Sequence, residues 1–211
     1  MKIVLMCIFG TFFGASLFAS QPVVEGGKVQ GASVEAGSQS QSSSGFTKIL
    51  KLQGLTFHIR ATDEGSLNQL TIVPEGLSGG VKETIREEIE GTVSGAEVAD
   101  INGDGFPELY IYVTSAGSGS YGTLFAYASN RNRSLTPIYL PEISEEKRVG
   151  EGYMGHDSFA VEGTRLIRTF PRYSKDDSNA NSTGGTREVS YKLEAGEAGW
   201  ILKIEMYKDL P

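Results

Sequence analysis

Asp100–Tyr127 reads DINGDGFPELYIYVTSAGSGSYGTLFAY, and this stretch decides the fold. One apolar run, Glu108–Val113, follows a turn rich in Asp, Asn and Gly. A second run, Thr123–Ala128, follows a loop of glycine and serine. Short apolar runs separated by such residues are typical of strands joined in a hairpin. The stretch therefore predicts a rigid hairpin with Ser118 and Tyr121 at its tip, and nothing in it resembles a hydrolytic or redox centre.

Strand patterns also dominate the chain on both sides of this hairpin. Two alternating segments, 46–52 and 55–60, flank Gln53–Gly54 and predict another hairpin. Further strands are expected at 69–73, 97–100, 158–162, 165–170, 187–193 and 200–206. In the last of these, we expect the side chains of Trp200, Leu202, Ile204 and Met206 on one face.

Two segments do not follow this pattern. In segment 81–89 the apolar residues are four apart, which is the spacing of a helix. Its β-branched residues also agree with a strand, so both interpretations stay open. Segment 176–185 is a polar insertion that predicts a loop. Because the remaining strands are short and joined by Gly-rich turns, we expect one all-β domain over 46–211, an antiparallel β-sandwich or barrel-like fold.

The N-terminal part of the chain predicts export. Lys2 supplies a charged start, and the apolar run Ile3–Phe18 ends just before Ser20, which is typical of a signal peptide over 1–19. The run is short for a membrane span and is interrupted by glycines. Segment 20–45 is rich in Ser, Gly and Gln and predicts a disordered tether.

Charge and cysteine content narrow the classes of partner. Removing the leader removes Lys2 and Cys7, which leaves 18 basic and 26 acidic residues, a net charge of −8, and no cysteine. Nucleic acids and anionic membranes attract basic patches, so neither is an expected partner. A basic protein partner agrees with this charge, and so does simple solubility. Without disulfides, the fold depends on its own core.

Five motifs, in order along the chain, resemble the periplasmic inhibitors of invertebrate-type (i-type) lysozyme. The motifs are Asp100–Tyr110 (DINGDGFPELY), Ser115–Gly122 (SAGSGSYG), Ile138–Pro141 (IYLP), Gly152–Gly163 (GYMGHDSFAVEG) and Leu166–Tyr173 (LIRTFPRY). The resemblance covers about 91–206 and leaves 20–90 largely outside it. It implies a small antiparallel β-fold, exported to the periplasm of a Gram-negative bacterium, that blocks host lysozyme without turnover or cofactor.

The resemblance also implies which residues bind the partner. The inhibitory loop of the family carries a serine and, three residues later, a tyrosine, and Ser118 and Tyr121 match this spacing, with Gly119 and Ser120 between them. Ser120 and Ser115 lie in the same loop and leave the choice of the serine open. Both hydroxyl types bond carboxyl groups, and the tyrosine ring is flat enough to lie where a sugar would.

A second site is indicated by the turn before the hairpin. Asp100, Asn102, Asp104 and Glu108 occupy positions 1, 3, 5 and 9 of a calcium loop with glycine at position 6. Position 12 is Ile111, so the bidentate glutamate is missing, and a turn stabilised by Asp and Asn side chains explains the pattern equally well. A calcium-stabilised adhesion or glycan-binding module is therefore the alternative function.

A hydrolase has little support. His156 and Asp157 are adjacent, and adjacent residues of a strand point to opposite faces, so we expect His156 to support a turn or loop instead. Arg165, Arg168 and Arg172 suggest a basic strand edge without an assigned role. An open sheet edge leaves a homodimer possible.

Overall fold

The computed structural model describes residues 45–79 and 84–211. These residues form an all-β fold, which confirms the predicted class, with two sheets and one short 3-10 turn, η1 (Ile143–Glu145). The expected leader at 1–19 lies outside the described residues, and so does the expected tether at 20–45 except for its last residue. None of the helices in the described part of the chain is long and apolar enough to cross a membrane.

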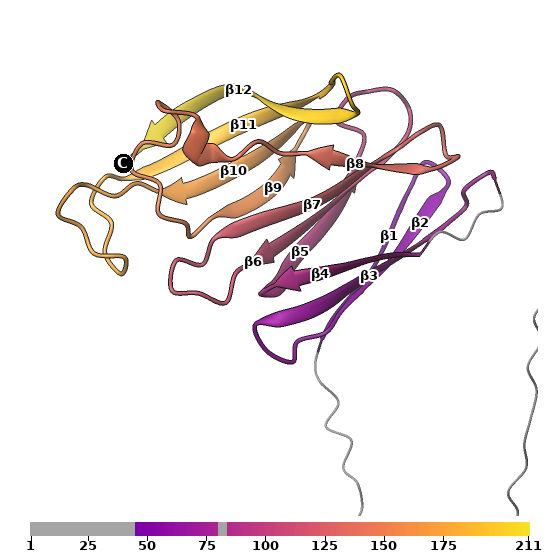
Figure 1. Cartoon of the computed structure of the whole chain (residues 1–211). Coiled ribbons are helices and arrows are strands. Elements are labelled where there is room, and N and C mark those ends of the chain that lie inside the picture. Colours follow the sequence, from indigo (N-terminus) through magenta and orange to yellow (C-terminus); the bar gives the residue numbers. More distant parts are fainter. Residues whose placement is uncertain (1–44, 80–83) are drawn as a thin grey trace, which may run out of the picture. The chain divides into compact units, whose positions relative to one another are not determined.

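The smaller sheet contains four antiparallel strands in chain order (Figure 1). They are β1 (Phe46–Leu52), β2 (Leu55–Ala61), β3 (Leu67–Glu75) and β4 (Ile85–Glu90). Gln53 and Gly54 connect β1 to β2 with φ angles of 46° and 84°, the left-handed values that a two-residue hairpin needs. The ambiguous segment is a strand from Ile85 onward, while 81–83 lie outside the described residues.

The larger sheet contains eight strands in the order β5-β6-β7-β8-β12-β11-β10-β9. Their bounds are β5 (Thr92–Ala99), β6 (Glu108–Thr114), β7 (Gly122–Ser129), β8 (Leu135–Tyr139), β9 (Ser158–Glu162), β10 (Arg165–Pro171), β11 (Thr186–Ala195) and β12 (Trp200–Leu210). Neighbouring strands are antiparallel except β8 and β12, which run parallel over two residue pairs. The sequence pattern did not predict β8, because Pro137 interrupts a run of only five residues.

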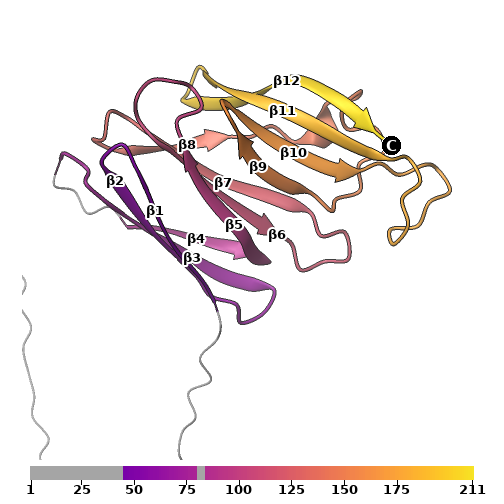
Figure 2. The same cartoon turned by 180° about the vertical axis from the view of Figure 1, so that it is seen from behind.

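Strand β6 is central because both of its faces are buried. Leu109, Ile111 and Val113 face a core shared with the smaller sheet, while Tyr110 and Tyr112 face a second core inside the larger sheet. Side chains alternate along a strand, so a strand covered on both sides needs an unbroken apolar run. Figures 1 and 2 show β5 and β6 between the smaller sheet and the remaining strands.

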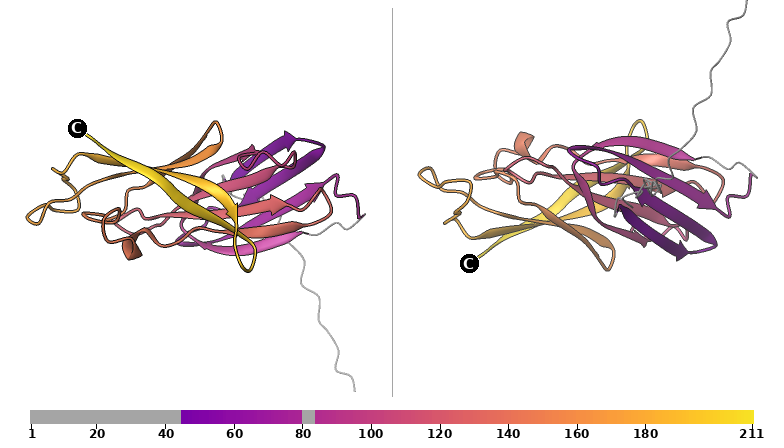
Figure 3. Two further views of the ribbon diagram at one scale, coloured as in Figure 1. Left: turned by 90° about the horizontal axis from the view of Figure 1, so that it is seen from above. Right: turned by 90° about the horizontal axis from the view of Figure 1, so that it is seen from below.

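The larger sheet curls until its two edge strands, β5 and β9, come together. Figure 3 shows β12, in yellow, crossing over the other half of the sheet. At the closure, one carboxylate oxygen of Glu97 accepts hydrogen bonds from the hydroxyl of Tyr112 at 2.5 Å and from the backbone N–H of Val161 at 2.9 Å. The ring of Tyr112 stacks on Phe159 with centroids 5.7 Å apart. Side chains thus join edges that lack a backbone ladder.

We expect Glu97→Ala to lower the free energy of unfolding by about 2 kcal/mol, because it leaves two donors at the closure without their acceptor. Urea denaturation measures the change. Glu97→Gln keeps a carbonyl acceptor at the same place and should lose less. If Glu97→Ala is as stable as the unaltered chain, the hydrogen bonds of Glu97 at this closure contribute nothing to the free energy of unfolding.

One expectation about β12 is wrong. Trp200, Leu202 and Ile204 contact the core as predicted, but Met206 is exposed on the opposite face. The register with β11 shifts between Ser190 and Tyr191, which pair with Met206 and Ile204 respectively. This bulge inserts one residue, Glu205, and so reverses the alternation beyond it.

Candidate functional site

The loop between β6 and β7, residues 115–121, is closed by its own hydrogen bonds. The backbone N–H of Ser115 donates to the carbonyl of Tyr121 at 2.9 Å, and the N–H of Tyr121 donates back to the hydroxyl oxygen of Ser115 at 2.9 Å. The N–H of Ser120 donates to the carbonyl of Gly117 at 3.0 Å. Ser120 has a φ of 43°, a left-handed value that is uncommon for serine. The predicted hairpin is confirmed, and its tip has a defined conformation.

The tip presents side chains to solvent. Tyr121 is 48% exposed, and Ser118 is also exposed. No hydrogen bond within the described residues uses the hydroxyl of either side chain, whereas the hydroxyl of Ser115 is occupied by Tyr121. Of the three serines that the sequence left open, Ser118 is the exposed one, so its hydroxyl is the one most available to a partner.

A second segment, 153–157, supports the loop from one side. The backbone N–H of His156 donates to the carbonyl of Gly119 at 2.8 Å. A Cβ atom on Gly155 would lie 2.1 Å from the same carbonyl oxygen, so only glycine allows this approach. The ring of Tyr153 meets Tyr121 edge to face, with centroids 5.8 Å apart. The exposed tyrosine thus packs against a half-buried partner.

A buried carboxylate, Asp157, fixes the end of the loop. One of its oxygens accepts hydrogen bonds from the backbone N–H of Gly122 at 2.8 Å and from the hydroxyl of Tyr153 at 2.7 Å. The other accepts from Nε of Arg168 at 2.6 Å. A Cβ on Gly122 would lie 2.5 Å from Cβ of Asp157, so a side chain at this position would push the carboxylate away.

Arg168 compensates the buried charge of Asp157. The side chains are 4% and 0% exposed respectively. Burial acts to lower the pKa of Arg168, but the charge and hydrogen bond of Asp157 outweigh it and raise the pKa. Arg168 also donates to the hydroxyl of Tyr153 at 2.7 Å and lies over its ring at 5.0 Å. Burial raises the pKa of Tyr153, so this hydroxyl stays protonated and donates to Asp157.

A third segment reaches the loop from the β10–β11 connection. The side-chain amide of Asn179 donates to the carbonyl of Ser118 at 2.6 Å. This polar insertion is itself held by Asp177, which accepts from the backbone N–H groups of Ser174 and Thr183 at 2.6 and 2.8 Å. These hydrogen bonds lower the pKa of Asp177, and the bond from Ser174 has the largest effect. Figure 1 shows both loops at the same end of the larger sheet.

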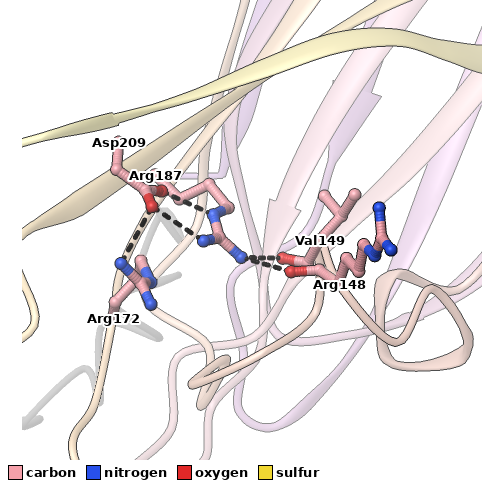
Figure 4. A network of polar contacts seen from close by, with 5 residues as sticks. All are labelled: Arg148, Val149, Arg172, Arg187 and Asp209. Atoms are coloured by element: carbon pink, nitrogen blue, oxygen red, sulfur yellow. Dashed lines mark hydrogen bonds and ion pairs between the residues drawn. The ribbon is translucent and has the colours of Figure 1, made fainter.

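The connection that leads into segment 153–157 is anchored as well (Figure 4). Arg187 on β11 donates to the carbonyls of Arg148 and Val149 at 2.7 and 2.8 Å. It also makes a two-point ion pair with Asp209, at 2.7 and 2.9 Å, and Arg172 binds the same carboxylate at 2.9 Å. Planar pairs of this kind fix direction as well as charge. The connection that leads to Tyr153 therefore starts from a fixed point.

The structure changes the interpretation of several charged residues. His156 and Asp157 do not form a pair, as expected, and the backbone of His156 supports the loop. The basic edge suggested by three arginines is wrong: Arg165 pairs with Glu205, Arg168 is buried against Asp157, and Arg172 joins Asp209. Arg168 lies two residues after Leu166 and two residues before Phe170, so alternation along the strand places it on the same inward face as these core residues. This position was the signal in the sequence for a buried ion pair.

Three of the four predicted calcium ligands come together at the turn before β6. Carboxylate oxygens of Asp100, Asp104 and Glu108 lie within 4.8 Å of one another. Asp100 accepts from the backbone N–H groups of Asp104 and Gly105 at 3.1 and 2.9 Å. An all-oxygen set of this kind suits Ca²⁺. The same bonds also stabilise a turn without an ion, so the geometry fits both interpretations.

Glu108 is the buried member of this set. Its carboxyl group accepts from the backbone N–H of Ile101 at 2.8 Å, and burial raises its pKa from 4.5 to about 8. Between these two values the folded chain holds a proton that the unfolded chain has released. The free energy of unfolding should therefore fall as pH rises from about 4.5 to about 8. We expect urea denaturation across this range to show the fall and Glu108→Gln to reduce it. An unchanged profile in Glu108→Gln would contradict the assignment.

Fold and site together define an all-β protein that presents one braced loop with an exposed tyrosine. Compared with known proteins, the chain matches no family model, no curated protein and no solved structure.

Proposed function

We propose that this chain is a periplasmic protein inhibitor of i-type lysozyme, and not an enzyme. The loop Ser118–Tyr121 enters the active-site cleft of the lysozyme and covers its catalytic carboxyl groups. The observation that supports this most strongly is the contrast between an exposed Tyr121 and a loop backbone that two other segments, 153–157 and the β10–β11 connection, hold in place. A loop that is already ordered loses little conformational entropy on binding. The resemblance of five co-ordered motifs points to the same function.

The chemistry of the tip agrees with this target. Retaining lysozymes use two carboxyl groups about 5 Å apart in a cleft that accepts sugar rings. The hydroxyls of Ser118 and Tyr121 donate to a carboxylate and accept from a protonated acid, which replaces the water that such a cleft loses. The ring of Tyr121 fills apolar space at low entropy cost. Occlusion of this kind requires neither turnover nor a cofactor.

The test is the residual activity of i-type, chicken-type and goose-type lysozymes on bacterial cell walls, titrated with the purified chain. We expect stoichiometric inhibition of the i-type enzyme. Inhibition of another type alone would keep the mechanism and change the target. If none of the three enzymes is inhibited, the proposed function is wrong.

The alternative is a calcium-stabilised adhesion or glycan-binding module. It is favoured by the three carboxylates that meet before β6. In this case Ca²⁺ should raise the melting temperature, and a chelator should reverse the rise. Asp104→Asn should abolish the response. Calcium-dependent binding to peptidoglycan, without inhibition of any lysozyme, would favour this module over the inhibitor.

A further inference from the structure

A groove of about 570 Å³ adjoins the loop on the β7–β8 side. We call it the Tyr139 groove. Tyr121 and Leu124 line it from the loop and β7, Tyr139 and Glu142 from the end of β8 and the segment that follows, and Tyr153 and Arg168 from the support beneath the loop. Tyr121 thus belongs to both the loop and the groove, and the two form one continuous surface.

The groove combines exposed aromatic side chains with a rigid lining. Tyr139 is 59% exposed, more than Tyr121. Protein interfaces concentrate their binding energy in such side chains, tyrosine among the foremost. Beneath them, Tyr153 is fixed by its hydrogen bonds to Asp157 and Arg168, so the groove keeps its form without a partner. This is the arrangement of a preorganised contact surface.

The surface area buried in a stable complex is larger than this loop alone can provide, so a partner of the loop must contact the protein outside the loop as well. Stable protein complexes bury about 800 Å² on each partner, contributed by about 20 to 30 residues. The four residues Ser118–Tyr121 cannot supply this area alone. A protein that takes the tip into a cleft must therefore rest the rim of that cleft on the surface beside it. The Tyr139 groove is the aromatic part of that surface.

The charged residues of the groove indicate which side chains of the partner would fit against it. The positive charge of Arg168, which lines the groove, is neutralised by Asp157, because Nε of Arg168 lies 2.6 Å from Oδ1 of Asp157. Glu142 is exposed and makes no ion pair with any residue that the structure describes. An unpaired carboxylate at the edge of an interface favours a lysine or arginine opposite it, which affects association rate and salt dependence more than affinity.

We propose that the Tyr139 groove is a second contact surface for the enzyme that the loop inhibits. It takes a protruding segment beside the enzyme's cleft, and a basic side chain of that segment lies against Glu142. This assignment depends on the proposed function and extends it, because it predicts that residues outside the loop determine how tightly the enzyme is held.

The experiment compares inhibition constants for i-type lysozyme between the unaltered chain and Tyr139→Ala. Leu67→Ala, also exposed but on the smaller sheet, is the control. We expect Tyr139→Ala to weaken inhibition tenfold or more at an unchanged melting temperature, and Leu67→Ala to leave both unchanged. Thr123→Arg, which places a bulky cation in the groove, should weaken inhibition further. Glu142→Gln should mainly slow association and reduce its dependence on salt.

The outcomes separate this assignment from the proposed function. If the unaltered chain inhibits and Tyr139→Ala and Thr123→Arg inhibit equally well, the groove is not a contact surface and the loop acts without it. If the unaltered chain inhibits no lysozyme, the proposed function is wrong and the partner assigned to the groove is wrong with it.

Discussion

Arg168→Ala is expected to lower the free energy of unfolding by about 3 to 5 kcal/mol, the largest effect that we predict for stability. The substitution leaves the carboxylate of Asp157 buried, with Tyr153 and Gly122 as its remaining donors. A buried charge without a counter-ion is strongly unfavourable, whereas the intact pair contributes far less than its loss removes. Urea denaturation, followed by tryptophan fluorescence and by circular dichroism, measures the change.

Arg165→Ala is the matched control for this prediction. Arg165 lies on the same strand and also makes an ion pair, with Glu205, but its side chain is 46% exposed. Pairs of this kind contribute at most about 1 kcal/mol. Equal losses for the two substitutions would mean that burial of the Asp157–Arg168 pair adds nothing. Hydrogen exchange at the backbone N–H of Gly122 should increase in Arg168→Ala alone.

Local patterns were sufficient to predict most of the fold. Alternation and turn residues located the hairpins around Gln53–Gly54 and Ser118–Tyr121, because each pairs segments that are close in sequence. The parallel contact of β8 with β12 joins segments about sixty residues apart, and a run that contains Pro137 gives no sign of it. The bulge that exposes Met206 depends on pairing with β11, which alternation in β12 alone does not reveal.

The candidate site was predictable only in part, for the same reason. The loop and its tyrosine are contiguous in sequence and were located directly. The groups that hold the loop come from far along the chain: Asp157 is 35 residues from Gly122, and Asn179 is 61 residues from Ser118. Only Arg168 left a signal, because it shares the inward face of β10 with Leu166 and Phe170. A charged residue in that position indicates a buried partner without identifying it.

Tyr121→Ala is expected to weaken inhibition of i-type lysozyme by about 2 kcal/mol or more, about thirtyfold, because tyrosines at the centre of an interface contribute most of its binding energy. The side chain is half exposed, and its ring lies against Tyr153 and beside Gly119 and Gly155. Its removal should therefore change stability by less than about 1 kcal/mol. Titration of lysozyme activity gives the inhibition constant, and thermal unfolding shows that the variant is folded.

Two further variants divide the effect of Tyr121 between ring and hydroxyl. Tyr121→Phe keeps the ring and removes the hydroxyl that would bond a catalytic carboxyl group. The increase in the inhibition constant that Tyr121→Phe causes therefore measures the contribution of that hydrogen bond. Ser118→Ala tests the neighbouring hydroxyl in the same way. Because the backbone of the loop is held by groups outside it, neither change should move the loop. A folded Tyr121→Ala chain that inhibits as well as the unaltered one would remove this loop from the mechanism.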